Sequence, residues 1–240
     1  MSARLTVLRA VACVGLLAGS TAWAQTEAFL QRLLRVAGIS AVPSAQKGPG
    51  EELESGDVWI ASLAERTRLR LTHGGGYRSP VFAPGDPSVL ALKESTLVTI
   101  PPGGGGAKAS HVLKGASKLV GFSSERPGDL LVVFDADSGP WLGFVALASG
   151  QVTRLPHDRS SREHRTMLTH VMDWERVYAD TTLYVKAESK QGLTGPVEWT
   201  DVYLKRRAEP VNVSRCDGVS CGQPSLSHDG SRVVFVKVGQ

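Results

Sequence analysis

From residue 57 to the C-terminus, short apolar runs alternate with turns rich in Gly, Pro, Asp and Ser. The runs are dense in Val, Leu, Ile and aromatic residues, and 130–135 (LLVVFD) and 232–238 (RVVFVKV) are typical. Runs of this length and composition, bounded by turn residues, predict β-strands, and no long helical periodicity interrupts them. The pattern therefore predicts an all-β domain over residues 57–240.

The predicted strands recur as a unit of two hairpins, which we denote a–b and c–d. Strand b begins at Val89, Leu130, Thr182 and Val233, with spacings of 41, 52 and 51 residues. Such spacings suit one four-stranded blade per repeat. The complete units comprise residues 78–83, 89–93, 96–100 and 110–113, then 118–123, 130–135, 142–147 and 151–155, and finally 168–174, 182–187, 202–204 and 210–213.

Each end of this domain carries half a unit. A lone c–d hairpin (57–63 and 69–72) opens it, and a lone a–b hairpin (223–227 and 232–238) closes it. Joined in one sheet, the two hairpins complete a blade and remove the exposed edges of an open array. We therefore predict a small β-propeller of about four four-stranded blades, its ring closed by the N- and C-terminal hairpins. An irregular β-sandwich is the alternative, and the Gly-rich segment 101–118 leaves the blade count open.

One amphipathic helix precedes the predicted propeller. Residues 26–38 place apolar side chains at helical spacing, and a linker rich in Pro, Gly, Ser and charge follows at 43–56. Thr26 can cap the start of the helix and Gly38 its end. A helix of this length is marginal alone in water, so its apolar face must pack on the domain or on a partner protein. That face comprises Phe29, Leu30, Leu33, Leu34 and Ala37.

The first 24 residues are typical of a cleaved signal peptide. A basic start (Arg4, Arg9) leads into an apolar run at 10–18, and Ala22 and Ala24 occupy the small-residue positions that signal peptidase reads. The run is too short for a membrane span. A lipoprotein anchored at Cys13 is the alternative reading. We expect cleavage after Ala24, a periplasmic or secreted protein without a membrane span, and a division into 1–24, 25–56 and 57–240.

Charge and cysteine content limit which classes of partner and cofactor are expected. The formal net charge is +4, and its basic residues are scattered rather than gathered into a stripe, which argues against nucleic acid as a partner. Beyond the leader the chain keeps Cys216 and Cys221, an even pair that predicts a disulfide in an exported protein. Zinc needs more ligands than this pair offers. We expect no cofactor.

The sequence contains no recognisable catalytic motif. A Gly-x-Ser-x-Gly turn is absent, so we expect a protein that is not an enzyme. Asp135 and Asp137 resemble half of a calcium loop, although alternating aspartates before glycine also form plain turns. The polar stretch 157–170 is interpreted as a solvated loop, with a metal site as the alternative on account of its three histidines: His157, His164 and His170.

Two stretches resemble the repeats of TolB-type (WD-repeat-like) propellers. They are residues 56–60 with 69–80 (GDVWI … LRLTHGGGYRSP), and residues 224–235 (PSLSHDGSRVVF). The family's turn is usually Ser-Pro-Asp-Gly, and His228 here replaces the proline. The resemblance implies a β-propeller, a periplasmic setting and binding to other proteins. TolB itself carries more blades and a separate α/β domain, for which this chain has no room.

Propeller geometry predicts where binding would occur. Loops d–a and b–c emerge on one face, which would carry residues 189–194 and six candidate binding residues: His73, Tyr77, Arg78, Arg162, Arg165 and Asp217. Aromatic and arginine side chains often anchor protein interfaces. The predicted function is a non-catalytic interaction module that binds a protein of the cell envelope. The alternative is a propeller that binds a small molecule, glycan or metal, with a reaction in its central channel. The sequence does not fix the oligomeric state.

Overall fold

The computed structural model describes residues 55–122, 126–137, 139–155, 181–193, 195–206 and 209–238. Within these residues the chain is all-β, with 15 strands in four antiparallel sheets and no helix. The signal peptide, the helix at 26–38 and most of its linker lie outside this part, so those predictions stay as predictions. In the same residues no helix has the length and apolar character to span a bilayer.

Both ends of the described chain meet in one sheet, as the half units predict. Its order is β14 (Cys221–Leu226), β15 (Arg232–Lys237), β1 (Asp57–Ser62) and β2 (Arg68–Arg70). Strand β1 pairs with β15 without interruption, from Asp57 opposite Lys237 to Ser62 opposite Arg232. Consecutive residues of both strands are apolar, so this register buries side chains on both sides of the sheet. We call it the terminal sheet.

The next two sheets follow the predicted units closely. One comprises β3 (Tyr77–Phe82), β4 (Val89–Lys93), β5 (Thr96–Ile100) and β6 (Lys108–Val112). The other comprises β7 (Ala116–Phe122), β8 (Asp129–Phe134), β9 (Trp141–Ala146) and β10 (Val152–Arg154). Each is a four-stranded meander in the order a, b, c, d, so both predicted four-stranded units are confirmed.

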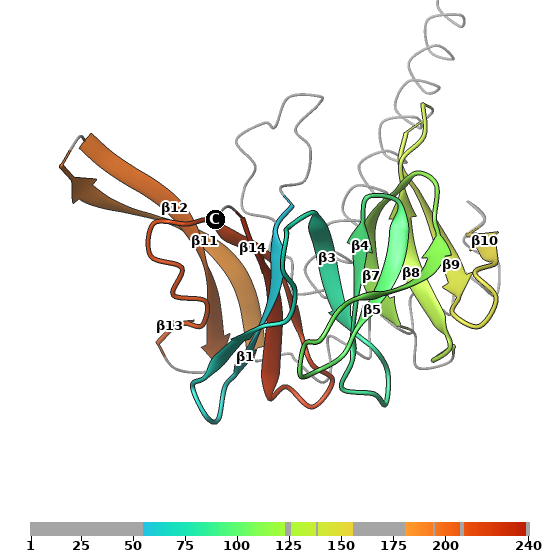
Figure 1. Ribbon diagram of the computed structural model, residues 1–240, viewed down its shortest axis with the longest axis horizontal. Coiled ribbons are helices and arrows are strands. Elements are labelled where there is room, and N and C mark those ends of the chain that lie inside the picture. The colour runs from blue at the N-terminus through green and yellow to red at the C-terminus, as the bar shows by residue number, and fades with distance from the viewer. Residues whose placement is uncertain are drawn as a thin grey trace, which may run out of the picture.

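The remaining sheet departs from its prediction. It has β11 (Thr181–Gly192), β12 (Gly195–Arg206) and β13 (Val211–Asn212), while the predicted first strand at 168–174 lies outside the described residues. Strands β11 and β12 are 12 residues each, about twice the predicted 182–187 and far more than 202–204. Their pairing continues to Gly192 opposite Gly195, so the hairpin extends well past the sheet (Figure 1). We call residues 186–201 the arm.

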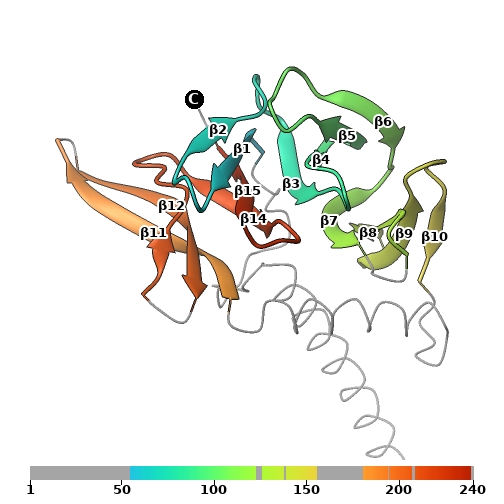
Figure 2. The same ribbon diagram turned by 90° about the horizontal axis from the view of Figure 1, so that it is seen from below.

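The four sheets stand side by side in an arc (Figure 2). Apolar clusters fill the three spaces between neighbours: one joins the terminal sheet to β11–β13, one joins it to β3–β6, and one joins β3–β6 to β7–β10. Contacts run between first strands, β14 with β3 and β3 with β7. This is the arrangement of propeller blades. The sheets β7–β10 and β11–β13 occupy the two ends of the arc, and closure of the ring stays a prediction.

Irregular positions in the first strands connect adjacent sheets. Ser79 and Gln223 both precede a proline and both have positive φ (49° and 50°), at bulges in β3 and β14. The Ser79 N–H donates to Oε1 of Gln223 at 2.6 Å. Arg78 Nη2 donates to the carbonyl of Ala116 on β7 at 3.0 Å. The bulges thus turn polar groups of one sheet toward the next.

Candidate functional site

One end of the sheets, uppermost in Figure 1, carries the loops that the sequence predicts as a binding face. Three segments make up this loop face: residues 71–76 after β2, residues 213–220 after β13, and the outer half of the arm. Strand c of a sheet runs away from this end and strand d returns to it, so a residue of strand c that lies near this end can reach the loop that follows strand d. Two aspartates do so.

Asp57, at the start of β1, holds the loop 71–76. Its Oδ1 accepts hydrogen bonds from Thr72 Oγ1 and from the backbone N–H of Gly75, both at 3.0 Å. Its Oδ2 pairs with Arg70 Nη2 at 2.5 Å, and Arg70 Nε donates to the Thr72 carbonyl at 2.9 Å. Thr72 Oγ1 in turn accepts the N–H of Val58 at 2.9 Å. Both oxygens of the carboxylate are therefore engaged, one by the loop 71–76 and the other by Arg70.

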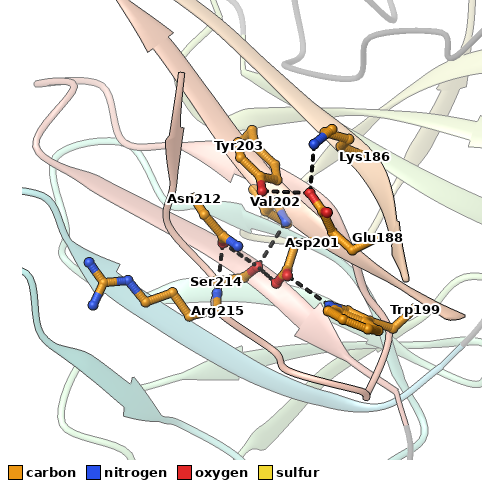
Figure 3. Close-up of polar contacts among 9 residues, drawn as sticks. All are labelled: Lys186, Glu188, Trp199, Asp201, Val202, Tyr203, Asn212, Ser214 and Arg215. Atoms are coloured by element: carbon orange, nitrogen blue, oxygen red, sulfur yellow. Dashed lines mark hydrogen bonds and ion pairs between the residues drawn. The ribbon is translucent and has the colours of Figure 1, made fainter. Parts of the chain in front are cut away.

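Asp201, on β12, holds the loop 213–220 in a corresponding way (Figure 3). Its Oδ1 accepts from Ser214 Oγ at 2.6 Å and from the N–H of Cys216 at 2.7 Å. Its Oδ2 accepts from Trp199 Nε1 at 2.8 Å. Ser214 Oγ accepts the N–H of Val202 at 2.8 Å. Asp201 is only 2% exposed, so this network is part of the interior.

The two arrangements are copies of one device, which we call the aspartate latch. In each, Asp is followed by Val on strand c, and the hydroxyl of Thr72 or Ser214 bridges the carboxylate and the N–H of that valine. The residue before the hydroxyl also pairs with the same valine, since Leu71 and Val213 donate their N–H groups to its carbonyl. A latch fixes the first residues of the loop and thereby sets its direction.

Hydrogen bonding keeps Asp201 ionised despite its burial. Burial alone raises the pKa of this carboxyl, but the hydrogen bonds from Ser214, the Cys216 N–H and Trp199 outweigh it, and the pKa of Asp201 lies below its ordinary value. A buried carboxylate of this kind is stable only while its donors stay in place. The latch therefore couples the charge of Asp201 to the conformation of the loop 213–220.

The loop 213–220 is further closed by a disulfide between Cys216 and Cys221, with Cα atoms 6.3 Å apart, as predicted. Both cysteines are buried, at 4% and 0% exposure, and belong to the apolar cluster beneath the loop. Arg215 and Asp217 have positive φ, and the Arg215 N–H donates to Asn212 Oδ1 at 2.8 Å. The tight turn is thus held from both ends, and Asp217 points outward.

The arm lies against this loop through charged and aromatic side chains. Lys190 Nζ pairs with Asp217 Oδ1 at 2.7 Å and lies 5.5 Å from the centre of the Trp199 ring. Nearer the sheet, Glu188 Oε1 accepts from Lys186 Nζ at 2.8 Å and from the Tyr203 hydroxyl at 2.6 Å. Two apolar side chains near the tip are open to solvent, with Leu193 fully exposed and Val197 36% exposed.

Those contacts also shift the titration of the arm's polar groups. The hydrogen bonds from Lys186 and Tyr203 lower the pKa of Glu188, and the pKa of Tyr203 rises because its hydroxyl donates to that carboxylate. The pKa of the Lys186 amine rises as well, because the amine donates a hydrogen bond to Glu188. All three groups therefore keep their ordinary charge states at neutral pH.

A pocket of about 290 Å³ opens beside the latch of Asp57. Three chain segments line it: the start of β1, the glycine loop after β2 and the end of β15. Lys237 Nζ lies 5.2 Å from the centre of the Trp59 ring at its wall. The lining residues are Ser55, Gly56, Asp57, Trp59, Arg70, Gly74, Gly75 and Lys237.

The predicted binding residues fall into different environments. His73 is exposed in the loop 71–76, and Asp217 is exposed in the disulfide loop. Tyr77 is 6% exposed and packs in the cluster between the terminal sheet and β3–β6, so it is a core residue and offers no surface anchor. Arg78 Nη2 donates hydrogen bonds to the carbonyls of Glu94 and Ala116, so Arg78 links adjacent sheets.

Other candidates are separate from this face or outside the described part. Arg162 and Arg165 lie in 156–180, as do the three histidines of the polar stretch, and the structure does not describe them. Asp135 and Asp137 are exposed in the β8–β9 loop, where Asp135 accepts a hydrogen bond from Ser117 Oγ at 3.1 Å. Among the residues described, no group of three or more His, Cys, Asp or Glu side chains could hold a metal ion.

Comparison with known proteins finds similarity among solved structures. No protein-family model and no curated protein sequence matches the chain. The chain is similar to a structure assigned as a TolB of Agrobacterium tumefaciens, with 12% sequence identity and a TM-score of 0.36. The match covers 74% of this chain and 59% of that chain, less than two thirds of its length. The fold description therefore rests on the four sheets themselves.

Sequence reasoning missed the residues that organise the loop face. Asp57, Arg70, Asp201 and Ser214 carry no catalytic signature and were not among the candidates. A signal exists, because Asp-Val-Trp at 57–59 followed by Leu-Thr at 71–72 recurs as Asp-Val-Tyr at 201–203 followed by Val-Ser at 213–214. Alignment of the predicted units on their c–d hairpins would have placed these residues in register.

Proposed function

We propose that this chain is a non-catalytic, TolB-like interaction module of the cell envelope, and that its loop face binds another protein. The observation that carries the proposal is the arm, a hairpin that extends past its sheet and ends in exposed apolar residues (Figure 1). Apolar side chains on a projecting hairpin cost free energy in water, and a partner surface can cover them. Leu193 and Val197 are the central residues of this surface.

Rigidity at the base of the arm supports the same proposal. The Asp201 latch, the disulfide and the Lys190–Asp217 pair all fix the loop against the arm. A surface that is ordered before it meets its partner loses less conformational entropy on binding. The polar groups at the base are already satisfied within the chain, so the arm's exposed tip and flank remain for contact.

The expected location fits this role. The predicted signal peptide would export the chain, and the disulfide is of the kind that persists in oxidising compartments. We therefore place the module in the periplasm or outside the cell. Osmotic-shock fractionation tests this part separately, because a chain retained in the cytoplasm with its leader uncleaved would contradict it.

The binding role is tested by crosslinking the mature chain, residues 25–240, to an envelope extract and quantifying captured proteins by mass spectrometry. We expect one dominant partner, and we expect its capture to fall about tenfold in a variant with Leu193→Ser and Val197→Ser. Both side chains are exposed, so the variant should fold normally.

The matched control is Val211→Ser, which removes an apolar side chain, 55% exposed, from β13 of the same sheet but away from the arm. Capture should be unchanged in this variant. Equal capture by all three proteins, or capture of many proteins without a dominant one, would rule out the arm as the binding element.

A further inference from the structure

The pocket beside the Asp57 latch has the character of a ligand site. At about 290 Å³ it is at the small end of the range for small-molecule sites. It combines an aromatic wall, Trp59, with two cationic side chains, Arg70 and Lys237, that come from different strands. Convergence of few polar groups on one aromatic surface is typical of sites that orient a small ligand.

The carboxylate of Asp57 is not available to bind a ligand. Both of its oxygens are engaged, by Thr72 and Gly75 on one side and by Arg70 on the other. Asp57 is 9% exposed, while the Arg70 side chain keeps 25% exposure. Asp57 therefore neutralises and orients Arg70, and the planar guanidinium lies fixed in the pocket wall.

Among the residues that line the pocket, Lys237 supplies the remaining positive charge. Its amine lies over the Trp59 ring, and within the described residues it has no carboxylate partner, although Asp57 is directly opposite it in the strand register. With Arg70 neutralised by Asp57, the lining keeps one net positive charge. An ammonium on a lysine stem at the mouth of a pocket can swing toward an incoming anion.

The glycine loop leaves room for that anion. Gly74 and Gly75 have positive φ, and a Cβ placed on either would meet no atom within 4 Å. The pocket is therefore open along this side, and backbone rather than side chain forms the wall. Close approach of a ligand to backbone is a recurrent reason for glycine in such loops.

From these observations we infer that the pocket binds a monocarboxylate, held by Lys237, with the apolar part of the ligand against Trp59. A single negative charge balances the lining, whereas a phosphate dianion would leave an excess. The carboxylate can belong to a free small organic acid or to the C-terminus of a peptide. This inference does not depend on the arm, so either proposal can fail without the other.

The test is isothermal titration calorimetry on the purified chain with three probes: N-acetylalanine, the peptide N-acetyl-tetra-alanine with a free C-terminus, and the same peptide as its C-terminal amide. We expect both acids to bind and the amide to bind at least about tenfold more weakly. Equal affinity of the two acids identifies a small organic acid as a sufficient ligand. Tighter binding of the peptide acid identifies a peptide C-terminus.

The variants Lys237→Met and Lys93→Met provide the matched comparison. Lys93 lies over the Tyr77 ring at 4.8 Å in the same cation–π geometry, on β4 and outside the pocket lining. Lys237→Met should weaken binding of both acids about tenfold, Lys237→Arg should retain it, and Lys93→Met should leave it unchanged. Equal binding of acid and amide, no binding of either acid up to about 10 mM, or equal loss in both methionine variants would overturn the inference.

Discussion

The two aspartate latches share an Asp-Val pair on strand c and a hydroxyl in the loop after strand d, yet they hold loops of opposite character. Asp57 holds a loop of three consecutive glycines with positive φ, open toward a pocket. Asp201 holds a loop closed by a disulfide and packed on an apolar cluster. The comparison shows that a repeat can conserve the start of a loop while the rest of the loop differs.

The two latches also differ in the third donor to the aspartate. In the first latch it is the guanidinium of Arg70, a charged group that remains partly in water. In the second it is the indole N–H of Trp199, a neutral donor, and Asp201 is nearly inaccessible. A charge-assisted bond near solvent tolerates exchange with water, whereas a buried carboxylate with neutral donors has no substitute for them.

The largest effect that we predict separates the two latches directly. Asp201→Ala should lower the free energy of unfolding by about 3 to 4 kcal/mol, because Ser214, the Cys216 N–H and Trp199 lose their buried acceptor. Asp57→Ala should cost about half as much, about 2 kcal/mol, because Arg70 can turn to solvent. Urea unfolding followed by circular dichroism measures both.

Ser214→Ala provides the control for this comparison, since it removes one donor of Asp201 together with the acceptor of the Val202 N–H, and leaves the carboxylate with two donors. It should cost about 1 to 2 kcal/mol. If Asp57→Ala and Asp201→Ala destabilise the chain equally, burial does not distinguish the latches and the contrast drawn above is wrong.

The disulfide should have the next largest effect. Replacing Cys216 and Cys221 together with serine should cost about 2 kcal/mol, the loop-closure entropy of so short a ring. The loss should be non-additive with Asp201→Ala, because the Cys216 N–H is one of the latch donors. A double-mutant cycle measures this coupling, and strict additivity would show that the latch holds the loop without help from the disulfide.

Gly75→Ala should disturb the first latch alone. At φ +68° an alanine is strained by about 1 kcal/mol, although no atom blocks its Cβ. The matched control is Gly222→Ala on β14, where φ is not positive and the added Cβ also meets nothing within 4 Å. Thermal unfolding should show a lower midpoint for the first variant only, and a similar decrease in both would argue against backbone strain.

Much of the fold followed from the sequence because its signals are local. The short apolar runs of β1, β4, β8 and β15, with turn residues between them, were sufficient to place the strands and to join both ends in one sheet. The arm was missed because the described residues of 188–199 are exposed or half-buried on both faces, so pairing there depends on the hairpin register rather than on burial.

The candidate site was harder to predict, for a physical reason. Tyr77 and Arg78 were chosen by residue type at a loop position, but burial depends on the neighbouring sheet, which the local sequence does not specify. The latch residues were overlooked because Asp and Thr near turns have an ordinary local explanation. Only the repetition of the Asp-Val and Thr or Ser pattern in two units distinguishes them.

The smallest predicted effect is the loss of stability at low pH, because protonation removes the charge of Asp201 but keeps its oxygens in place. The pKa of Asp201 is lower in the folded chain, so the unfolded chain takes up the proton first as pH falls. The stabilisation from this group is complete above about pH 4 and is lost below it. Asp229 contributes in the same direction, because hydrogen bonds from Ser227 and Ser231 lower its pKa.

Asp201→Asn should therefore flatten the decline in stability below pH 4 only partly, and Asp229→Asn should remove a further share. Urea unfolding at a series of pH values measures the slopes, and an Asp201→Asn slope equal to that of the unmodified chain would show that the latch does not hold an ionised carboxylate.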